Sequence, residues 1–345
     1  MYESNRKSSI VNIYLGSMKI AYVLPMTWAC GGISAPLSQV NALSTRGHDI
    51  TVFAPKDGRI DWFPLAAPVQ VHCEHPVEEY FDAVVYVGDT FAQHPFSSAG
   101  QKFLLLQGKD HLWTAPAKRN ELLQGYSDPQ YHILVVSGWL ADFVHGKCGN
   151  PRISIIGNGI DINRFFPAPA PREKFRLLLE GNFPDRNKNV IAAIEIAGRV
   201  RQHFPVEVWA MARRFTSAGE LVDRVFLDPP SDEIPGIYQQ CDALIKTSIL
   251  EGFGLPHLEA MACGCIPITY ASGGVMDFCK HGENSLIAGV GNLPSLLGHV
   301  LHFLSDSDLR SQLKDGALAT AKLYPWNRVA DALERAFAGG IEGKS

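Results

Sequence analysis

Charged residues are scarce in this chain of 345 residues, at 19% of the sequence, and the formal net charge is −4. A weakly acidic chain of this kind is poorly suited to hold nucleic acid through many phosphate contacts. Its seven cysteines are odd in number and form no Cys-x-x-Cys pair, so they indicate neither a disulfide framework nor a zinc site. No apolar run reaches the roughly 18 residues that a membrane-spanning helix needs.

The first 17 residues also lack the features of a secretory signal. Residues 10–15 form one short apolar patch, which is not the long apolar core of a signal peptide. Residues 1–17 are therefore interpreted as a leader or an artificial extension, with a natural start at Met18. The cysteine content suits a reducing compartment, so we expect a cytoplasmic protein.

Apolar sequence is what the chain has in quantity, 46% of its residues, and 345 residues are enough for two domains with separate cores. Short, nearly continuous apolar runs alternate with helical stretches, a pattern typical of parallel sheets covered on both faces. A helix is expected over Ala35–Arg46, because its apolar residues recur at helical spacing up to Gly47. The strands expected in the first half are Ile20–Leu24, Asp49–Ala54, Val69–Cys73, Ala83–Val87, Phe103–Leu106, His132–Val136 and Ile153–Ile156.

A proline-rich segment at residues 166–171 interrupts the alternation and is interpreted as a semi-rigid linker. The strands expected beyond it are Phe175–Glu180, Val206–Ala210, Val225–Leu227, Ala243–Lys246 and Ile266–Tyr270. The predicted fold is α/β, with two doubly wound Rossmann-like parallel-sheet domains facing a central cleft, where ligands bind beyond the carboxyl ends of the strands. The expected limits are 18–165 for the N-terminal domain, 172–323 for the C-terminal domain and 324–345 for a final helix and tail.

One motif is more informative than the rest of the chain: Glu251-Gly-Phe-Gly-Leu-Pro-His-Leu-Glu259, which runs on into Ala260-Met-Ala-Cys-Gly-Cys-Ile-Pro267. Two carboxylates flank a Gly-Phe-Gly turn at the start of a helix of small residues. Such a turn directs backbone N–H groups outward, where the helix dipole favours a phosphate. The second carboxylate falls in the first or second helical turn, where it can take a ribose diol. The alternative is a helix capped by an acidic residue.

The complete string resembles the nucleotide-sugar signature of retaining glycosyltransferases of the GT-B fold, family 4 (glycosyltransferase group 1). The resemblance extends over roughly residues 18–337, diffusely in the first half and specifically from Gly181 onward. It implies an N-terminal domain on the acceptor side and a C-terminal domain that binds the nucleotide sugar. It also implies that the helix beginning near Trp326 crosses back to brace the N-terminal domain.

The resemblance implies a role for each matching residue. Glu251 is expected to face the transferred sugar, Glu259 to hold the ribose, and Lys188 to neutralise the diphosphate that leaves. Gly31 and Gly32 resemble the family's glycine-rich loop at the donor phosphate, with a plain strand-to-helix turn as the alternative. The other donor contacts that the resemblance implies are Leu227, Pro229, Gly252, Phe253, Gly254 and Leu255. No cofactor and no divalent metal are expected.

The chain departs from the family pattern at the start of the second domain. Asn182 stands where the family has an arginine that meets the diphosphate, and Thr247 replaces a proline. Lys188 still matches the family lysine. Arg186, in the same loop, is a candidate for the second cation, because a departing diphosphate calls for fixed positive charge. The alternative is that Arg186 is an ordinary solvated side chain.

A further candidate lies after the expected strand Phe103–Leu106. Many relatives place a histidine in this region, in contact with the transferred sugar, and His111 is the candidate here. Gln107 and Asp110 are rival cleft residues, and packing beside Trp113 is the alternative role for His111.

The sequence therefore predicts a retaining, metal-independent hexosyltransferase that moves a sugar from a nucleoside-diphosphate donor, a UDP- or GDP-sugar, to an acceptor hydroxyl. Its expected context is polysaccharide, lipopolysaccharide or glycoconjugate synthesis. The expected partners are the nucleotide sugar and a carbohydrate or other hydroxyl acceptor, with no nucleic acid and at most weak contact with the inner face of the membrane. The alternatives are an epimerase or phosphorylase-like enzyme of the same fold, or a non-catalytic nucleotide-sugar-binding protein.

Overall fold

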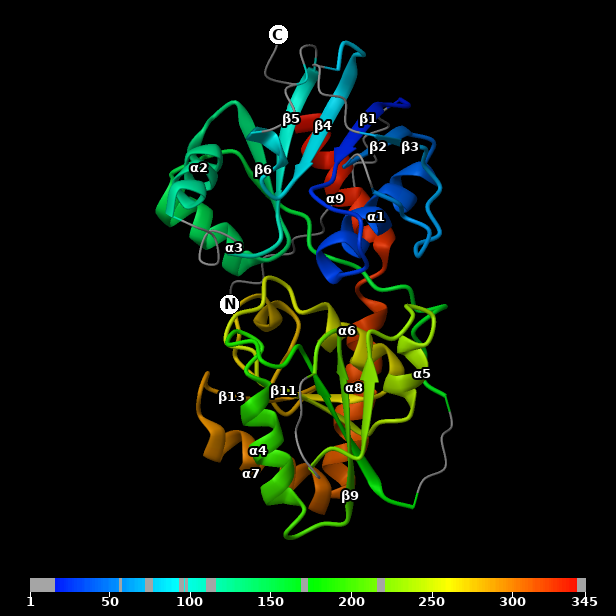
Figure 1. Ribbon diagram of the computed structural model, residues 1–345, viewed down its shortest axis with the longest axis vertical. Coiled ribbons are helices and arrows are strands. Elements are labelled where there is room, and N and C mark those ends of the chain that lie inside the picture. Colours follow the sequence, from blue (N-terminus) through cyan, green and yellow to red (C-terminus); the bar gives the residue numbers. More distant parts are fainter. Residues whose placement is uncertain are drawn as a thin grey trace, which may run out of the picture.

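The computed structural model describes residues 16–339 except for 56–57, 72–76, 93–95, 97–98, 110–115, 169–172 and 216–220. Two parallel sheets form the centres of two domains, which are stacked along the long axis of the molecule (Figure 1). The structure thus has the α/β architecture of two Rossmann-like domains that the sequence predicts. Within the described ranges, no helix is both long enough and apolar enough to cross a membrane.

The N-terminal sheet has seven parallel strands in the order β3-β2-β1-β4-β5-β6-β7. Its strands are β1 (Lys19–Val23), β2 (Asp49–Ala54), β3 (Val69–Val71), β4 (Phe81–Val87), β5 (Ala99–Leu106), β6 (Tyr131–Val135) and β7 (Ile153–Ile155). The central strands are buried almost throughout, because helices cover both faces of the sheet. The helices of this domain are α1 (Gly31–Ser44), α2 (Pro116–Ser127) and α3 (Gly138–Phe143).

The C-terminal sheet has six parallel strands in the order β10-β9-β8-β11-β12-β13. Its strands are β8 (Phe175–Glu180), β9 (Val206–Ala212), β10 (Arg224–Leu227), β11 (Ala243–Lys246), β12 (Ile266–Tyr270) and β13 (Leu286–Ala288). The helices are α4 (Val190–Val200), α5 (Ile234–Gln239), α6 (Leu255–Cys263), α7 (Leu293–Ser305) and α8 (Ser307–Lys322). In both sheets the strand order reverses beside the first strand of the domain, which creates the crevice that doubly wound folds use for ligands.

Most of the expected elements occur where the sequence predicts them, and their ends differ from the prediction by up to four residues. Strand β5 begins at Ala99, four residues before the expected start. Helix α1 begins at Gly31 and not at Ala35, so the two glycines form its first turn.

The last helix, α9 (Trp326–Gly339), returns to the N-terminal domain and lies along α1 (Figure 1). Arg46, just after α1, bonds the Glu334 carboxylate at 2.6 Å, and the rings of Phe103 and Phe337 pack edge to face at 4.9 Å. The chain therefore crosses between the domains twice, once after β7 and once before α9, and these crossings hold the two sheet edges opposite each other.

Candidate functional site

A cavity of about 450 Å³ lies between the two domains. Residues directly after four strands line it: Gln107 after β5, Gly181 after β8, Arg213 after β9 and Asp228 after β10. Gly31, the first residue of α1, lines it as well. Because all the strands of each sheet run in parallel, their carboxyl ends share one edge, and the two edges meet at this cavity. The site is where the doubly wound architecture is expected to bind a ligand.

The N-terminus of α1 forms one wall of the cavity. Its N-cap residue is Cys30, whose side chain makes no capping hydrogen bond, and Gly31 and Gly32 follow as the first helical residues. The Gln107 amide donates to the Gly32 carbonyl at 2.7 Å and joins this helix start to the end of β5. A helix start without a side-chain cap presents N–H groups and a partial positive charge, which suit a phosphate.

The N-terminus of α6 forms the opposite wall and explains the two glycines of the motif. Gly254 is the N-cap with φ +97°, a left-handed conformation that glycine adopts without strain, and no side chain caps this helix either. A Cβ added to Gly252 would lie 1.7 Å from the Gln107 carbonyl oxygen. Any side chain at position 252 would therefore push the two domains apart, so this glycine is needed for the closed arrangement.

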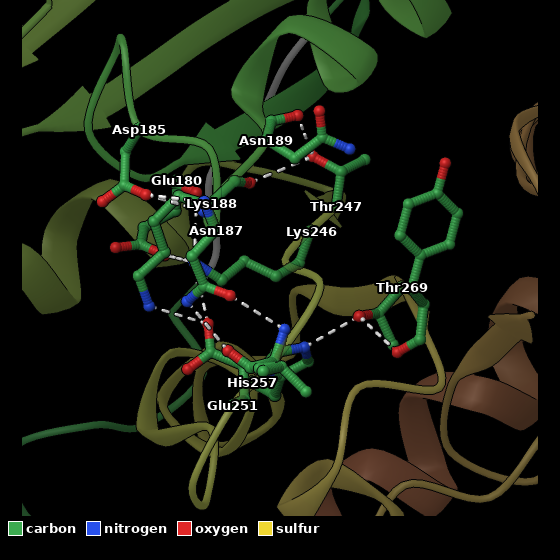
Figure 2. Close-up of polar contacts among 12 residues, drawn as sticks. Glu180, Asp185, Asn187, Lys188, Asn189, Lys246, Thr247, Glu251, His257 and Thr269 are labelled. Atoms are coloured by element: carbon green, nitrogen blue, oxygen red, sulfur yellow. Dashed lines mark hydrogen bonds and ion pairs between the residues drawn. The ribbon is translucent and has the colours of Figure 1, made fainter. Parts of the chain in front are cut away.

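Behind α6 a network of charged side chains reaches the cavity (Figure 2). Glu251 accepts from the Lys188 ammonium at 2.8 Å and lies 3.5 Å from the Lys246 ammonium, which also pairs with Glu180. Burial raises the pKa of Glu251, but Lys188 and Lys246 outweigh it and hold the pKa well below its usual range. Burial lowers the pKa of Lys188, but the Glu251 and Glu180 carboxylates outweigh it and raise the pKa. Both groups are therefore charged at neutral pH.

The loop that carries Lys188 is fastened to the segment before Glu251. The Asp185 carboxylate accepts from the backbone N–H of Asn187 at 2.8 Å and from that of Lys188 at 3.1 Å, which fixes the turn. The Thr247 hydroxyl donates to the Asn189 carbonyl at 2.8 Å (Figure 2). Threonine at the position of the family proline thus supplies a hydrogen bond between the loop and the residue that follows β11, which a proline side chain cannot make.

Glu259 lies in the second turn of α6, and it lines the cavity. The Tyr238 hydroxyl donates to its carboxylate at 3.2 Å. Burial and the neighbouring Glu180 carboxylate raise the pKa of Glu259 to about 7. On the other side of α6, burial lowers the pKa of His257 to about 3, and its ring bonds the Thr269 hydroxyl at 2.9 Å. The imidazole is therefore neutral and packs as a core side chain.

The cavity brings together most of the residues that the sequence singles out. The predicted site residues that line it are Gly31, Gly32, Lys188, Pro229, Glu251, Gly252, Phe253, Gly254, Leu255 and Glu259. Arg186 and Leu227 are exposed and are absent from the lining residues. His111 and Asp110 lie outside the described residues, whereas their rival Gln107 lines the cavity.

Several lining residues were not expected from the sequence: Arg164, Glu180, Asn182, Arg213, Asp228 and Tyr238. Lys246 was also missed, although it belongs to the network behind the cavity. One signal could have found two of them. Glu180 and Lys246 are charged residues at the last position of otherwise apolar strands, β8 and β11, and such a position points into the ligand crevice.

The chain contains an Asp-x-Asp pattern at Asp306-Ser307-Asp308, which the expectation of a metal-free site did not take into account. The Asp306 carboxylate accepts from the backbone N–H groups of Asp308 and Leu309 at 3.0 and 2.9 Å, as the N-cap of α8. These residues are not among those that line the cavity, so this pattern is a helix cap.

Comparison with known proteins adds a family to this geometry. Residues 216–319 match the family model described as glycosyl transferases group 1. The match lies within the C-terminal domain, which is thus similar to the group 1 glycosyltransferases. The D-inositol 3-phosphate glycosyltransferase of Salinispora arenicola is 24% identical over 229 residues, which cover 55% of this chain and 50% of that protein. The O-antigen chain mannosyltransferase B of Escherichia coli is 29% identical over 119 residues, 34% of this chain and 30% of that protein. The first of these matches thus spans about half of the curated relative, and the second less.

Solved structures extend the similarity to both domains. Anabaena HepE in complex with UDP and glucose superposes with a TM-score of 0.74 at 15% identity, covering 93% of this chain and 99% of that one. The sucrose-phosphate synthase of Thermosynechococcus elongatus superposes with a TM-score of 0.77 at 15% identity, covering 95% and 100%. The overall fold is GT-B.

Proposed function

We propose that the protein is a retaining glycosyltransferase that transfers a sugar from a nucleoside-diphosphate donor to an acceptor hydroxyl. One observation carries the proposal: two uncapped helix starts, a lysine and two carboxylates surround a single cavity between the domains. Helix starts and a cation suit a diphosphate, and a carboxylate suits a sugar hydroxyl. The match to the group 1 family model and the GT-B fold support the same assignment.

The donor is proposed to lie across the C-terminal wall of the cavity. Its diphosphate meets the N–H groups at the start of α6 and the Lys188 ammonium, with the start of α1 facing it from the other domain. Glu259 accepts hydrogen bonds from the ribose, and Pro229 contacts the base. Fixed positive groups of this kind stabilise the charge that develops as the diphosphate departs.

Glu251 is proposed to face the transferred sugar as an ionised group. Its lowered pKa excludes the role of a general acid at neutral pH, because the proton is already lost. As a carboxylate it can accept a hydrogen bond from a sugar hydroxyl and stabilise positive charge at the reacting carbon. A retaining reaction then proceeds either through a carboxylate nucleophile or, as the family resemblance favours, on one face of the sugar with the donor phosphate taking the acceptor proton.

We propose a UDP- or GDP-sugar donor and an acceptor of polysaccharide, lipopolysaccharide or glycoconjugate synthesis, acting in the cytoplasm or at the inner face of the membrane. HepE, which has the same fold, has been solved with UDP-glucose, and the Escherichia coli relative is named for an O-antigen chain. We further propose that the reaction needs no divalent metal, so activity should persist after treatment with EDTA. Activity lost to EDTA and restored by magnesium would overturn that part.

A thermal-shift panel of UDP-, GDP-, dTDP- and ADP-sugars tests the proposal, because a donor that binds the folded protein raises its melting temperature, and tighter binding raises it further. One donor class is expected to stabilise the protein and to be hydrolysed slowly, with release of the nucleoside diphosphate. Stabilisation without release would indicate a non-catalytic binding protein, and a change in the sugar of the intact donor would indicate an epimerase. No stabilisation by any donor would refute the proposal.

A further inference from the structure

The loop that follows β9 carries Arg213, which lines the cavity on the donor side. This loop is fixed by Asn182, whose side-chain oxygen accepts from the backbone N–H of Arg213 at 3.0 Å and from that of Arg214 at 3.1 Å. Asn182 is uncharged, but these two hydrogen bonds fix the backbone from which the Arg213 side chain extends. Asn182 therefore supplies no positive charge itself and instead positions the charged side chain of Arg213.

Asp228 fixes the guanidinium of Arg213 from the other side. Its carboxylate accepts from Arg213 Nε at 3.1 Å, and its backbone N–H donates to the Ala212 carbonyl at 2.7 Å. Asp228 has φ +45°, a left-handed conformation that costs energy for a residue with a side chain. Such strain persists where the surroundings hold it, and it clusters at ligand sites. Two separate features thus fix Arg213: the hydrogen bonds from its loop to Asn182 and the ion pair with the strained Asp228.

The other described cations of the cavity already have partners inside the protein. Lys188 is paired with Glu251 at 2.8 Å, and the guanidinium of Arg164 donates to the Ser231 carbonyl. Arg213 differs, because its partner Asp228 is 60% exposed and its own side chain is 41% exposed. A solvated pair of this kind contributes little stability, and Asp228 meets Arg213 at Nε, so the outer guanidinium nitrogens can bind an entering anion while Asp228 holds the side chain.

The guanidinium of Arg213 also lies near the start of α1. Burial raises the pKa of the Cys30 thiol, and the positive charge of Arg213 opposes that rise. The Arg213 charge therefore acts on Cys30, the N-cap residue of this helix. Cys30, Gly31 and Arg213 line the same cavity. The partial positive charge of α1 and the full charge of Arg213 therefore act on the same cavity, which Lys188 also lines.

We propose that Arg213 is the second cation of the diphosphate site and that Asn182 and Asp228 are the residues that position it. This inference rests on the proposed function, and it replaces Arg186, the candidate from the sequence. A diphosphate in this cavity would then meet two cations, Lys188 and Arg213, and the guanidinium fork can bind two phosphate oxygens at once.

Calorimetric titration of variants with UDP, GDP, ADP and dTDP tests the inference, using the nucleotide that binds the unaltered protein. Arg213→Ala is expected to weaken binding about 10- to 100-fold, the loss of a charge-assisted hydrogen bond. Arg213→Lys should retain part of the affinity. Arg214→Ala is the matched control, because Arg214 is the next residue of the same loop, is exposed and does not line the cavity; its affinity should stay within about threefold.

Titration with the corresponding nucleoside, which has no phosphate, separates a diphosphate contact from a general disturbance of the site. Its affinity should be unchanged by Arg213→Ala, and Asn182→Ala should weaken the diphosphate but not the nucleoside. Equal losses for both ligands, or an Arg213→Ala variant that matches Arg214→Ala, would overturn this inference and leave the proposed function intact. Failure of the unaltered protein to bind any of the four nucleotides would overturn both.

Discussion

Lys246 is the residue whose replacement tests the charge network of the site most directly. Its side chain is 0% exposed, at the end of β11. The ammonium pairs with the Glu180 carboxylate, donates to the Glu180 carbonyl at 3.2 Å and lies 3.5 Å from Glu251 (Figure 2). A buried lysine among carboxylates is stable only while each charge keeps its partner.

The substitution Lys246→Met keeps most of the side-chain volume and removes the charge. Glu180 and Glu251 then retain Lys188 as their nearby cation. Removal of one partner from a buried ion pair costs about 3–5 kcal/mol of unfolding free energy. For a domain of 150–250 residues 1 kcal/mol corresponds to about 2–4 °C, so the melting temperature should fall by about 6–20 °C.

Thermal unfolding followed at about pH 8 and about pH 5 adds a second readout. In the unaltered protein the lowered pKa of Glu251 means that its ion pairs stabilise the fold throughout this range. They are lost only when the pH falls through that lowered pKa. In Lys246→Met burial acts on Glu251 with one cation fewer, so its pKa should rise and protonation near pH 5 should relieve part of the penalty. The deficit in melting temperature should therefore be smaller at the lower pH.

Two further variants complete the experiment. The double variant Lys246→Met with Glu180→Gln should recover part of the loss, because it removes one of the unpaired carboxylates. Lys280→Met is the control, since Lys280 and its partner Glu283 are 66% and 70% exposed at 3.9 Å, and a surface pair contributes about 0–1 kcal/mol. If Lys246→Met melted within about 2 °C of the unaltered protein at both pH values, the reasoning about the buried network would be wrong.

Three other predictions concern the predicted site residues. Glu259→Ala should weaken nucleoside diphosphate binding by about 1.5–3 kcal/mol in titration calorimetry. The Glu259 pKa is about 7, and its ionised form is the one that accepts hydrogen bonds from the ribose hydroxyls. Nucleoside affinity should therefore rise between about pH 6 and 8, whereas Glu259→Gln should show no such rise. Glu251→Ala should mainly lower kcat; a change confined to KM would contradict its place at the sugar. Lys188→Ala should lower kcat/KM by about 10²–10³-fold, whereas the exposed Arg186 should matter by less than about threefold; an innocuous Lys188→Ala would refute the phosphate assignment.

The sequence by itself determined the two sheets and the motif around Glu251. Strand positions follow from local composition, because continuous apolar runs such as residues 103–106 suit strands covered on both faces. The glycines at 252 and 254 can also be interpreted without the structure, since a turn at a helix start needs residues without a side chain. These properties act over a few neighbouring residues, so the sequence order is enough to reveal them.

Only the tertiary structure decided which charges meet. Arg186 is the closer candidate along the chain, but Asn182 bonds the backbone of Arg213, 31 residues away, because β8 and β9 are neighbours in the sheet. Glu180 and Lys246 pair because β11 flanks β8 on its other side. The order of strands in a sheet follows from packing of the whole domain, so it cannot be predicted from local composition. Two charges far apart in sequence therefore become partners only once the chain has folded.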